Sequence, residues 1–412
     1  MLSLLSQRRF GPLFVTQFLG AFNDNLFKTA MLFLITYHMA GDLRTASVMV
    51  AAAGGVFILP FFLFSGIAGQ LADAVDKAAI ARAVKLAEIG ILGVGAIAIA
   101  LASVPMLFAV LFAMGAHSTI FGPVKYAFLP QHLRSDELLG GTGLVEGGTF
   151  VAILLGQVSG GLLSSFAVDA AMLTVAVAGW LSSRMIPAAP PEVVRPIDWN
   201  PVTASRTVLA RALTVRPVVI VTLAISWFWA LGAIFTSQFV PLVKGTLHAS
   251  ETVATLFLVV FTMGIAAGSA GVSRLLRGRV STQAAPWAAV AMAAASIDLI
   301  FAVQPVASTA SETVGLASFI ATPAAWRLLG DLFVLAAAGG VFSVPLYAIL
   351  QTRGRAATRS STVAANNIVN AAFQVAGVLL AGSAIARGMS IPLVLTISGA
   401  SALLMIPLLR KI

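Results

Sequence analysis

The fold is decided by one long apolar run, PLFVTQFLGAFNDNLFKTAMLFLITYH, at residues 12–38. Within this run Asp24 stands between two asparagines, and Lys28 follows four residues later. A bilayer core about 30 Å thick is crossed by roughly 20 helical residues, so the run is long enough to span a membrane. Asp24 would then lie about 18 Å along the helix, near the middle of the bilayer.

The whole chain shares this apolar character. Of its 412 residues 59% are hydrophobic and 10% are charged, against about 45–50% and about 25% in an ordinary soluble domain. A buried core cannot hold this excess, so we expect an all-α membrane protein with many spans. The absence of cysteine and the scattered positions of four histidines predict no metal site and no cofactor.

Charged residues and Pro/Gly clusters divide the chain into twelve predicted transmembrane helices. In the first half they are 12–38, 46–70, 80–103, 105–124, 138–164 and 166–186. In the second half they are 218–242, 252–273, 284–303, 326–350, 361–385 and 389–409. The intervening 187–216 is rich in proline, arginine and polar residues. We therefore expect an N-terminal six-helix bundle at 1–186, a cytoplasmic linker at 187–216, and a C-terminal six-helix bundle at 217–412.

Basic residues are distributed unevenly between the predicted loops. Twelve spans place both termini, the linker and each even-to-odd loop on one side, and most lysines and arginines fall there. On the other side lie only Arg44, Lys244, Arg327 and Arg387. The positive-inside rule therefore predicts a multi-pass membrane protein with both termini in the cytoplasm. The net charge of +10 follows from this bias and does not predict a nucleic-acid partner.

The two halves of the chain carry similar motifs at one shared offset. The sequence FVTQF at 14–18 recurs as FTSQF at 235–239, which is 221 residues later. The same offset relates Tyr126 to Tyr347 and Glu146 to Asn367. Two parallel six-helix pseudo-repeats joined by a linker resemble the two halves of a major facilitator transporter.

The loop after the second span, GQLADAVDKAAI at 69–80, resembles the signature of this superfamily between helices two and three. The resemblance implies that Gly69 permits a close helix contact and that Asp73 and Lys77 take part in conformational gating. The usual Gly-Arg-Arg cluster is reduced to Asp76-Lys77. The alternative interpretation is a solvated turn with a helix cap.

Three further motifs resemble a narrower group. FLGAFNDNLFK at 18–28, FGPVKYAFLPQHL at 121–133 and GLVEGG at 143–148 are similar to helices one, four and five of the bacterial lysophospholipid transporters. That group includes a version fused to acyltransferase and acyl-carrier-protein synthetase domains. The resemblance implies inward movement of lysophospholipid, chiefly lysophosphatidylethanolamine, across the inner membrane for reacylation. It also implies a functional link to an acyltransferase and synthetase, fused or separate.

One position departs from the group. Stand-alone members carry a basic residue within helix seven, whereas this chain has Thr236, Ser237 and Gln238 there and no base before Lys244. The chain therefore resembles the fused type more closely.

A charged residue at the bilayer centre costs at least about 2.5–3.5 kcal/mol, so Asp24 should face a cavity or a partner. A zwitterionic lysolipid head needs both signs of charge: Asp24 and Glu146 suit the ammonium group, and Lys28 or Lys125 the phosphate. The predicted substrate-binding set is Asp24, Asn25, Lys28, Lys125, Tyr126, Glu146, Gln238, Asn366 and Asn367. The alternatives are an Asp24–Lys28 bridge at i,i+4, a hydrogen-bonded helix contact for Glu146, and a snorkelling Lys125 that ends the fourth span.

The sequence lacks the motifs of two other functional classes, the acyltransferases and the ATP-driven pumps. An acyltransferase needs a His and an Asp five residues apart, but Leu43, Gly122, Glu137 and Val253 follow the four histidines at that spacing. A phosphate loop ends in Gly-Lys, and no lysine here follows a glycine. We therefore expect no enzyme, and any concentrative transport would use a Na⁺ or H⁺ gradient. A facilitator for another amphiphilic drug or metabolite is the alternative function.

Overall fold

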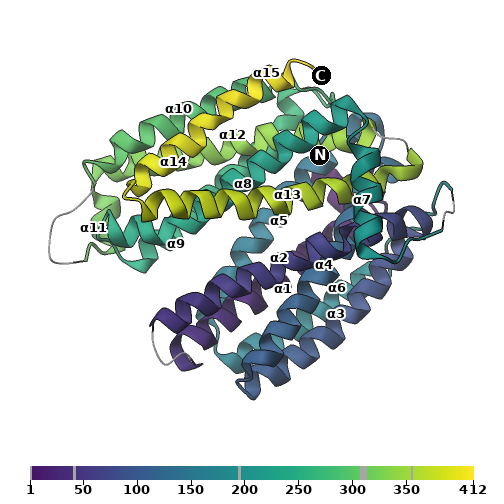
Figure 1. The fold of residues 1–412 in the computed structure, drawn as a ribbon, viewed down its shortest axis with the longest axis horizontal. Coiled ribbons are helices and arrows are strands. Elements are labelled where there is room, and N and C mark those ends of the chain that lie inside the picture. The colour runs from purple at the N-terminus through teal and green to yellow at the C-terminus, as the bar shows by residue number, and fades with distance from the viewer. Residues whose placement is uncertain (1, 40–42, 194–195, 307–312, 354–355) are drawn as a thin grey trace. The chain divides into compact units, whose positions relative to one another are not determined.

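The computed structural model describes residues 2–39, 43–193, 196–306, 313–353 and 356–412, and these are almost entirely helical (Figure 1). The helices of the first half are α1 Gly11–Leu34, α2 Leu43–Ala74, α3 Lys77–Ala100, α4 Val104–His132, α5 Ser135–Leu162 and α6 Ser165–Ser183. Those that follow are α7 Pro201–Ala212, α8 Arg216–Gly245, α9 Glu251–Leu275, α10 Ala285–Val303, α11 Leu316–Ala321, α12 Pro323–Arg353, α13 Arg359–Ala386, α14 Ile391–Ala400 and α15 Ile406–Leu409.

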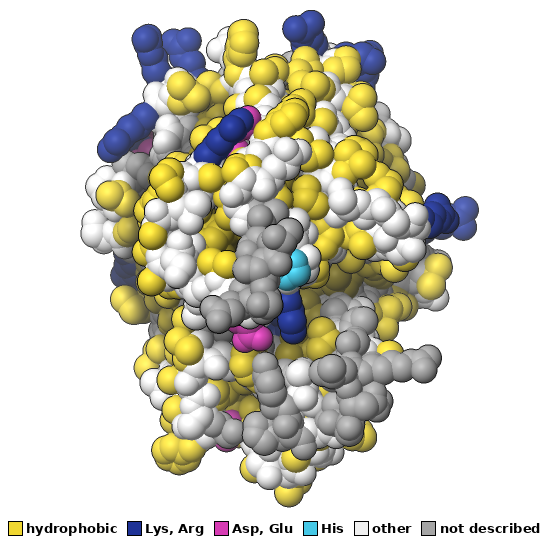
Figure 2. Space-filling view, turned by 90° about the vertical axis from the view of Figure 1, so that its left-hand side faces the viewer, with side chains coloured by type: hydrophobic (Ala, Val, Ile, Leu, Met, Phe, Trp, Pro, Cys, Tyr) yellow, Lys and Arg dark blue, Asp and Glu magenta, His cyan; other side chains and the backbone are white. Residues whose placement is uncertain are grey.

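The described helices confirm the predicted fold class. Eleven helical segments among them are long and apolar enough to cross a membrane. The remaining predicted span is α1, whose polar residues lower its hydropathy but whose 24 residues extend about 36 Å. Large hydrophobic side chains such as Leu379 and Leu380 are exposed, as expected of surfaces that face lipid. Figure 2 shows one face of the molecule, on which hydrophobic side chains are widespread and acidic ones are few.

The fourth predicted span ends too early. Lys125 was expected to end it, but α4 continues for seven more residues to His132, with Pro123 and Pro130 inside the helix. Prolines are tolerated within membrane helices because neighbouring groups satisfy the freed carbonyls. Lys125 therefore lies in the interior of α4 and is not a terminal snorkelling residue.

The described chain divides into two compact units. The first comprises Met1–Val218 and Leu350–Ile368, and the second Val219–Ile349 and Val369–Ile412. The end of α12 and the beginning of α13 thus belong to the first unit. Within the predicted linker, Pro201–Ala212 form the amphipathic helix α7, which the sequence pattern did not predict. The division into bundles at 187–216 stays a prediction.

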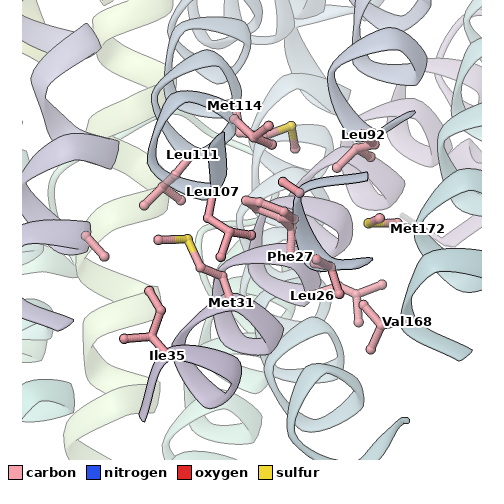
Figure 3. Packing of buried hydrophobic residues seen from close by; sticks show 14 of the residues in the cluster. Leu26, Phe27, Met31, Ile35, Leu92, Leu107, Leu111, Met114, Val168 and Met172 are labelled. Carbon is pink, nitrogen blue, oxygen red and sulfur yellow. The ribbon is translucent and has the colours of Figure 1, made fainter. Parts of the chain in front are cut away.

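A hydrophobic cluster in the first unit holds α1 in place (Figure 3). Leu26, Phe27 and Met31 of α1 are completely buried and pack with residues of α3, α4 and α6. On α5, glycines allow the helix backbones to approach closely. A methyl group added at Gly156 would lie 3.0 Å from the Leu26 nitrogen, and one added at Gly160 would lie 2.7 Å from the Leu26 oxygen. The position of α1, and of its acid, is therefore fixed by packing.

Candidate functional site

Asp24 lies in the middle of α1 with 8% of its surface exposed. Its Oδ2 accepts a hydrogen bond from the hydroxyl of Ser118 on α4, and its buried Oδ1 has no hydrogen-bond partner among the described residues. Lys28 is half-buried, and its Nζ lies 5.4 Å from the centroid of the Phe57 ring on α2. No oxygen of Asp24 lies within the 4.0 Å that defines a salt bridge to Lys28. The i,i+4 bridge is therefore not formed, and Asp24 keeps an unused acceptor.

A second polar group joins α4 and α5. The hydroxyl of Tyr126 donates a hydrogen bond to the carboxylate of Glu146, which is 1% exposed. The Nζ of Lys125 lies 4.8 Å from the centroid of the Tyr126 ring. The charges of both Glu146 and Asp24 act on Lys125. The fold therefore brings a base and a phenol of α4 close to an acid of α5. That these residues bind substrate stays a prediction.

The predicted amides lie in different surroundings. Asn25 is buried and donates a 2.9 Å hydrogen bond to the Ala21 oxygen of its own helix. Asn366 on α13 is completely buried, and neither atom of its amide has a partner among the described residues. Asn367 borders α4, since a methyl group added at Gly122 would lie 3.0 Å from its Nδ2. An unpaired buried amide is unusual and makes Asn366 a candidate for ligand binding.

Gln238, the remaining predicted residue, belongs to the second unit. It is buried on α8, and its Nε2 lies 3.2 Å from the Ser237 hydroxyl to which it donates. The other eight predicted substrate residues belong to the first unit.

A buried ionic network, which was not predicted, lies beside Asp24. Lys85 and Glu88 of α3 form a 2.6 Å salt bridge with no more than 1% of either side chain exposed. The Nε2 of His117 on α4 lies 3.2 Å from the same carboxylate oxygen, and Asn23 donates a 3.1 Å hydrogen bond to the other oxygen. The signal was present, because Lys85 and Glu88 are an i,i+3 pair of opposite charges inside the predicted span 80–103.

The predicted gating residues meet the beginning of α13. The carboxylate of Asp73 accepts hydrogen bonds from the backbone N–H of Ser360 at 2.8 Å and of Ser361 at 3.0 Å, and from the Ser361 hydroxyl at 2.6 Å. Gly69 lies one turn earlier, where an added methyl group would come 2.8 Å from the Ser361 Cα and 2.5 Å from the Ala364 Cβ. An anion at a helix N-terminus is stabilised by the free N–H groups and the helix dipole.

Asp73 therefore does not cap the third span. That cap is Asp76, which accepts a 2.9 Å hydrogen bond from the N–H of Ala79. Lys77 is 4% exposed, and its backbone N–H donates to the Ala189 oxygen at 3.1 Å. Lys77 and Asp76 thereby hold the linker against the ends of α2 and α3.

A partly buried ion pair lies close to the beginning of α1. The guanidinium of Arg9 donates two hydrogen bonds of 2.6 Å to the Glu137 carboxylate at the beginning of α5. These hydrogen bonds raise the pKa of Arg9 above its ordinary value. Among the described residues, no group of three or more His, Cys, Asp or Glu side chains is placed to hold a metal ion.

Known proteins match this chain over most of its length. One relative, "Lysophospholipid transporter LplT" of Pectobacterium carotovorum subsp. carotovorum, is 27% identical over 384 residues, covering 88% of this chain and 83% of the relative. A protein of the same name from Enterobacter sp. is 29% identical over 367 residues, with coverages of 86% and 81%.

Solved structures show the same fold. The human organic anion transporter MFSD10 (TETRAN) superimposes with a TM-score of 0.75 at 15% identity, covering 97% of this chain and 99% of its own. A bacterial homologue of the iron transporter ferroportin, in its outward-facing state, gives 0.72 at 12% identity, with coverages of 98% and 99%. The sequence model of the Major Facilitator Superfamily matches residues 13–381. The chain therefore belongs to the Major Facilitator Superfamily.

Proposed function

We propose that the protein is a secondary transporter, not an enzyme, which moves lysophospholipids inward across the bacterial inner membrane by alternating access. Lysophosphatidylethanolamine is the expected substrate, and reacylation by an acyltransferase and synthetase is its expected fate. Support comes from the superfamily match and from relatives named lysophospholipid transporters that align over more than four-fifths of this chain. The proposal places both termini in the cytoplasm, in agreement with the distribution of basic residues.

The observation that carries the proposal is that buried acidic and basic side chains occur together in the first unit. Asp24 keeps a buried carboxylate oxygen without a partner, which suits a substrate ammonium group. Lys125 is within 4.0 Å of no described carboxylate, so its ammonium is available for a phosphate. The Tyr126 hydroxyl orients Glu146 beside it. Buried charges with unused bonding capacity are functional candidates in membrane helices.

The contact of Asp73 with α13 supports alternating access. It joins a residue of the first sequence half to a helix of the second half, through hydrogen bonds that can be made and broken as a unit. Such a contact favours one conformation of the transporter and must be released to reach the other. Gly69 permits the close approach of α2 to α13. Lys77 follows Asp73 by four residues in the sequence.

The decisive experiment measures uptake of labelled lysophosphatidylethanolamine by proteoliposomes, with and without imposed Na⁺ or proton gradients. Asp24→Asn should abolish uptake, whereas Asp169→Asn, which removes an acid from α6, should leave it near the wild-type rate. Uptake by the Asp24 variant at the wild-type rate would exclude this acid from the mechanism. Transport of unrelated amphiphiles in preference to lysolipid would support the alternative facilitator function.

A further inference from the structure

The helix α7 lies outside the predicted spans and belongs to the first unit. The side chain of Asn200 accepts hydrogen bonds from the N–H groups of Val202 at 3.0 Å and Thr203 at 3.3 Å, which caps the helix. Two residues earlier, the N–H of Asp198 donates a 2.9 Å hydrogen bond to the side chain of Gln70 on α2. The beginning of α7 is therefore fixed beside α2.

A stripe of small residues packs α7 onto α2. Ala204, Val208 and Ala212 are spaced four residues apart and are buried. On α2, a methyl group added at Gly66 would lie 2.6 Å from the Ser205 Cα, so the two backbones are in direct contact. Gly66 precedes the last residue of α2, Ala74, by eight residues or about 12 Å. Figure 1 shows α7 running crosswise to α2. The contact therefore lies near the boundary between the bilayer core and its headgroups.

One exposed flank of α7 is apolar except for a single arginine. Val202, Arg206, Leu209 and Leu213 are spaced by four, three and four residues and so share that flank. Val202 is 73% exposed and Leu213 is 50% exposed, as is 67% of Trp199 just before the helix. An amphipathic helix with these properties lies in the interface of a membrane.

Between this flank and α2 runs an open groove of about 490 Å³. Its lining includes Phe62 and Leu63 of α2, and Val202, Arg206 and Leu209 of α7. The guanidinium of Arg206 makes no hydrogen bond or ion pair with a described residue. A groove with hydrocarbon walls and one uncommitted arginine matches a molecule that has an apolar chain and an anionic phosphate.

We propose that the groove between α7 and α2 binds an acidic phospholipid of the surrounding leaflet. Its phosphate pairs with Arg206, and one acyl chain lies along Phe62, Leu63 and Val202. By the charge distribution this is the cytoplasmic leaflet, whose anionic lipids are attracted to basic residues near the membrane. The site is separate from the residues proposed to bind substrate, and it prefers a net negative lipid over a zwitterionic one.

The test is native mass spectrometry of the full chain in detergent, titrated with phosphatidylglycerol. Arg206→Gln should weaken binding about fivefold, the effect expected of one basic residue near a lipid surface. Arg211→Gln is the matched control, since Arg211 is exposed on the same helix but does not line the groove. It should leave the affinity unchanged. Val202→Asp, which places a charge on the apolar wall, should weaken binding as well.

Three outcomes would overturn the proposal. If Arg206→Gln and Arg211→Gln weakened phosphatidylglycerol binding equally, the lipid would be attracted by the general surface charge and would not be bound in the groove. Phosphatidylcholine bound as tightly as phosphatidylglycerol would remove the role of the anionic head. Inorganic phosphate bound as tightly as phosphatidylglycerol at constant ionic strength would show that the acyl chain contributes nothing. None of these measurements depends on transport, so they remain decisive if the proposed substrate is wrong.

Discussion

The hydroxyl of Ser361 donates a 2.6 Å hydrogen bond to the carboxylate of Asp73, a residue 288 positions earlier in the chain. Two backbone N–H groups at the beginning of α13 donate to the same carboxylate. Because the backbone supplies two of the three donors, the contact depends far more on the acid than on the serine side chain.

This geometry predicts unequal effects of two substitutions. Asp73→Ala leaves the donors at the beginning of α13 unpaired, at a cost of about 1–3 kcal/mol for a buried donor without a partner. Ser361→Ala removes only one neutral donor and should cost about 1 kcal/mol or less. Lysolipid uptake and cysteine labelling on both sides of the membrane would measure the change in conformational balance. Equal effects of the two variants would argue against an acid-centred contact.

The size of residue 69 should control the same contact. Gly69→Leu would drive a side chain into Ser361 and Ala364, so we expect uptake to be lost although the protein still reaches the membrane. Gly54→Leu on the same helix is the matched control, because a methyl group added there meets no described atom within 4 Å. If both leucine variants transported normally, close approach at Gly69 would have no role.

Tyr126→Phe tests the pairing with Glu146. The variant keeps the ring beneath Lys125 but removes the hydroxyl that donates to the buried carboxylate. A buried acceptor left without its donor costs about 1–3 kcal/mol, so lysolipid binding should weaken by roughly five- to a hundred-fold. Equilibrium binding of labelled lysolipid is the measurement. Tyr347→Phe, at the corresponding position of the second half, should change the lysolipid affinity little. If Tyr126→Phe left the affinity unchanged, the pair of Tyr126 and Glu146 would have no part in substrate binding.

The ion pair of Lys85 and Glu88 should matter for stability. Removing one partner of a buried pair leaves an uncompensated charge and costs about 3–5 kcal/mol. We therefore expect Lys85→Met to lower the apparent melting temperature in detergent strongly. The double variant Lys85→Met with Glu88→Leu should recover part of the loss, since neither charge then remains. A double variant less stable than Lys85→Met would show that Glu88 is held mainly by His117 and Asn23.

The spans could be predicted because their signal is local: each is an apolar run long enough for a bilayer. The error in the fourth span arose because a charge was used as its boundary. Lys125 lies within α4, where its ammonium is 4.8 Å from the centroid of the Tyr126 ring. α7 was missed because it is short and its apolar face is narrow. The pairing of Asp73 with Ser361 depends on tertiary contact across 288 positions, which no local pattern contains.

Asn23 adjoins Asp24 on α1, and His117 adjoins Ser118 on α4. The network around Glu88 holds Asn23 and His117. Their neighbours Asp24 and Ser118 are hydrogen-bonded to each other. Neither helix can rotate about its axis without breaking both sets of contacts. The acid is thus preorganised before any headgroup arrives, and capture of a ligand does not incur the entropic cost of ordering it.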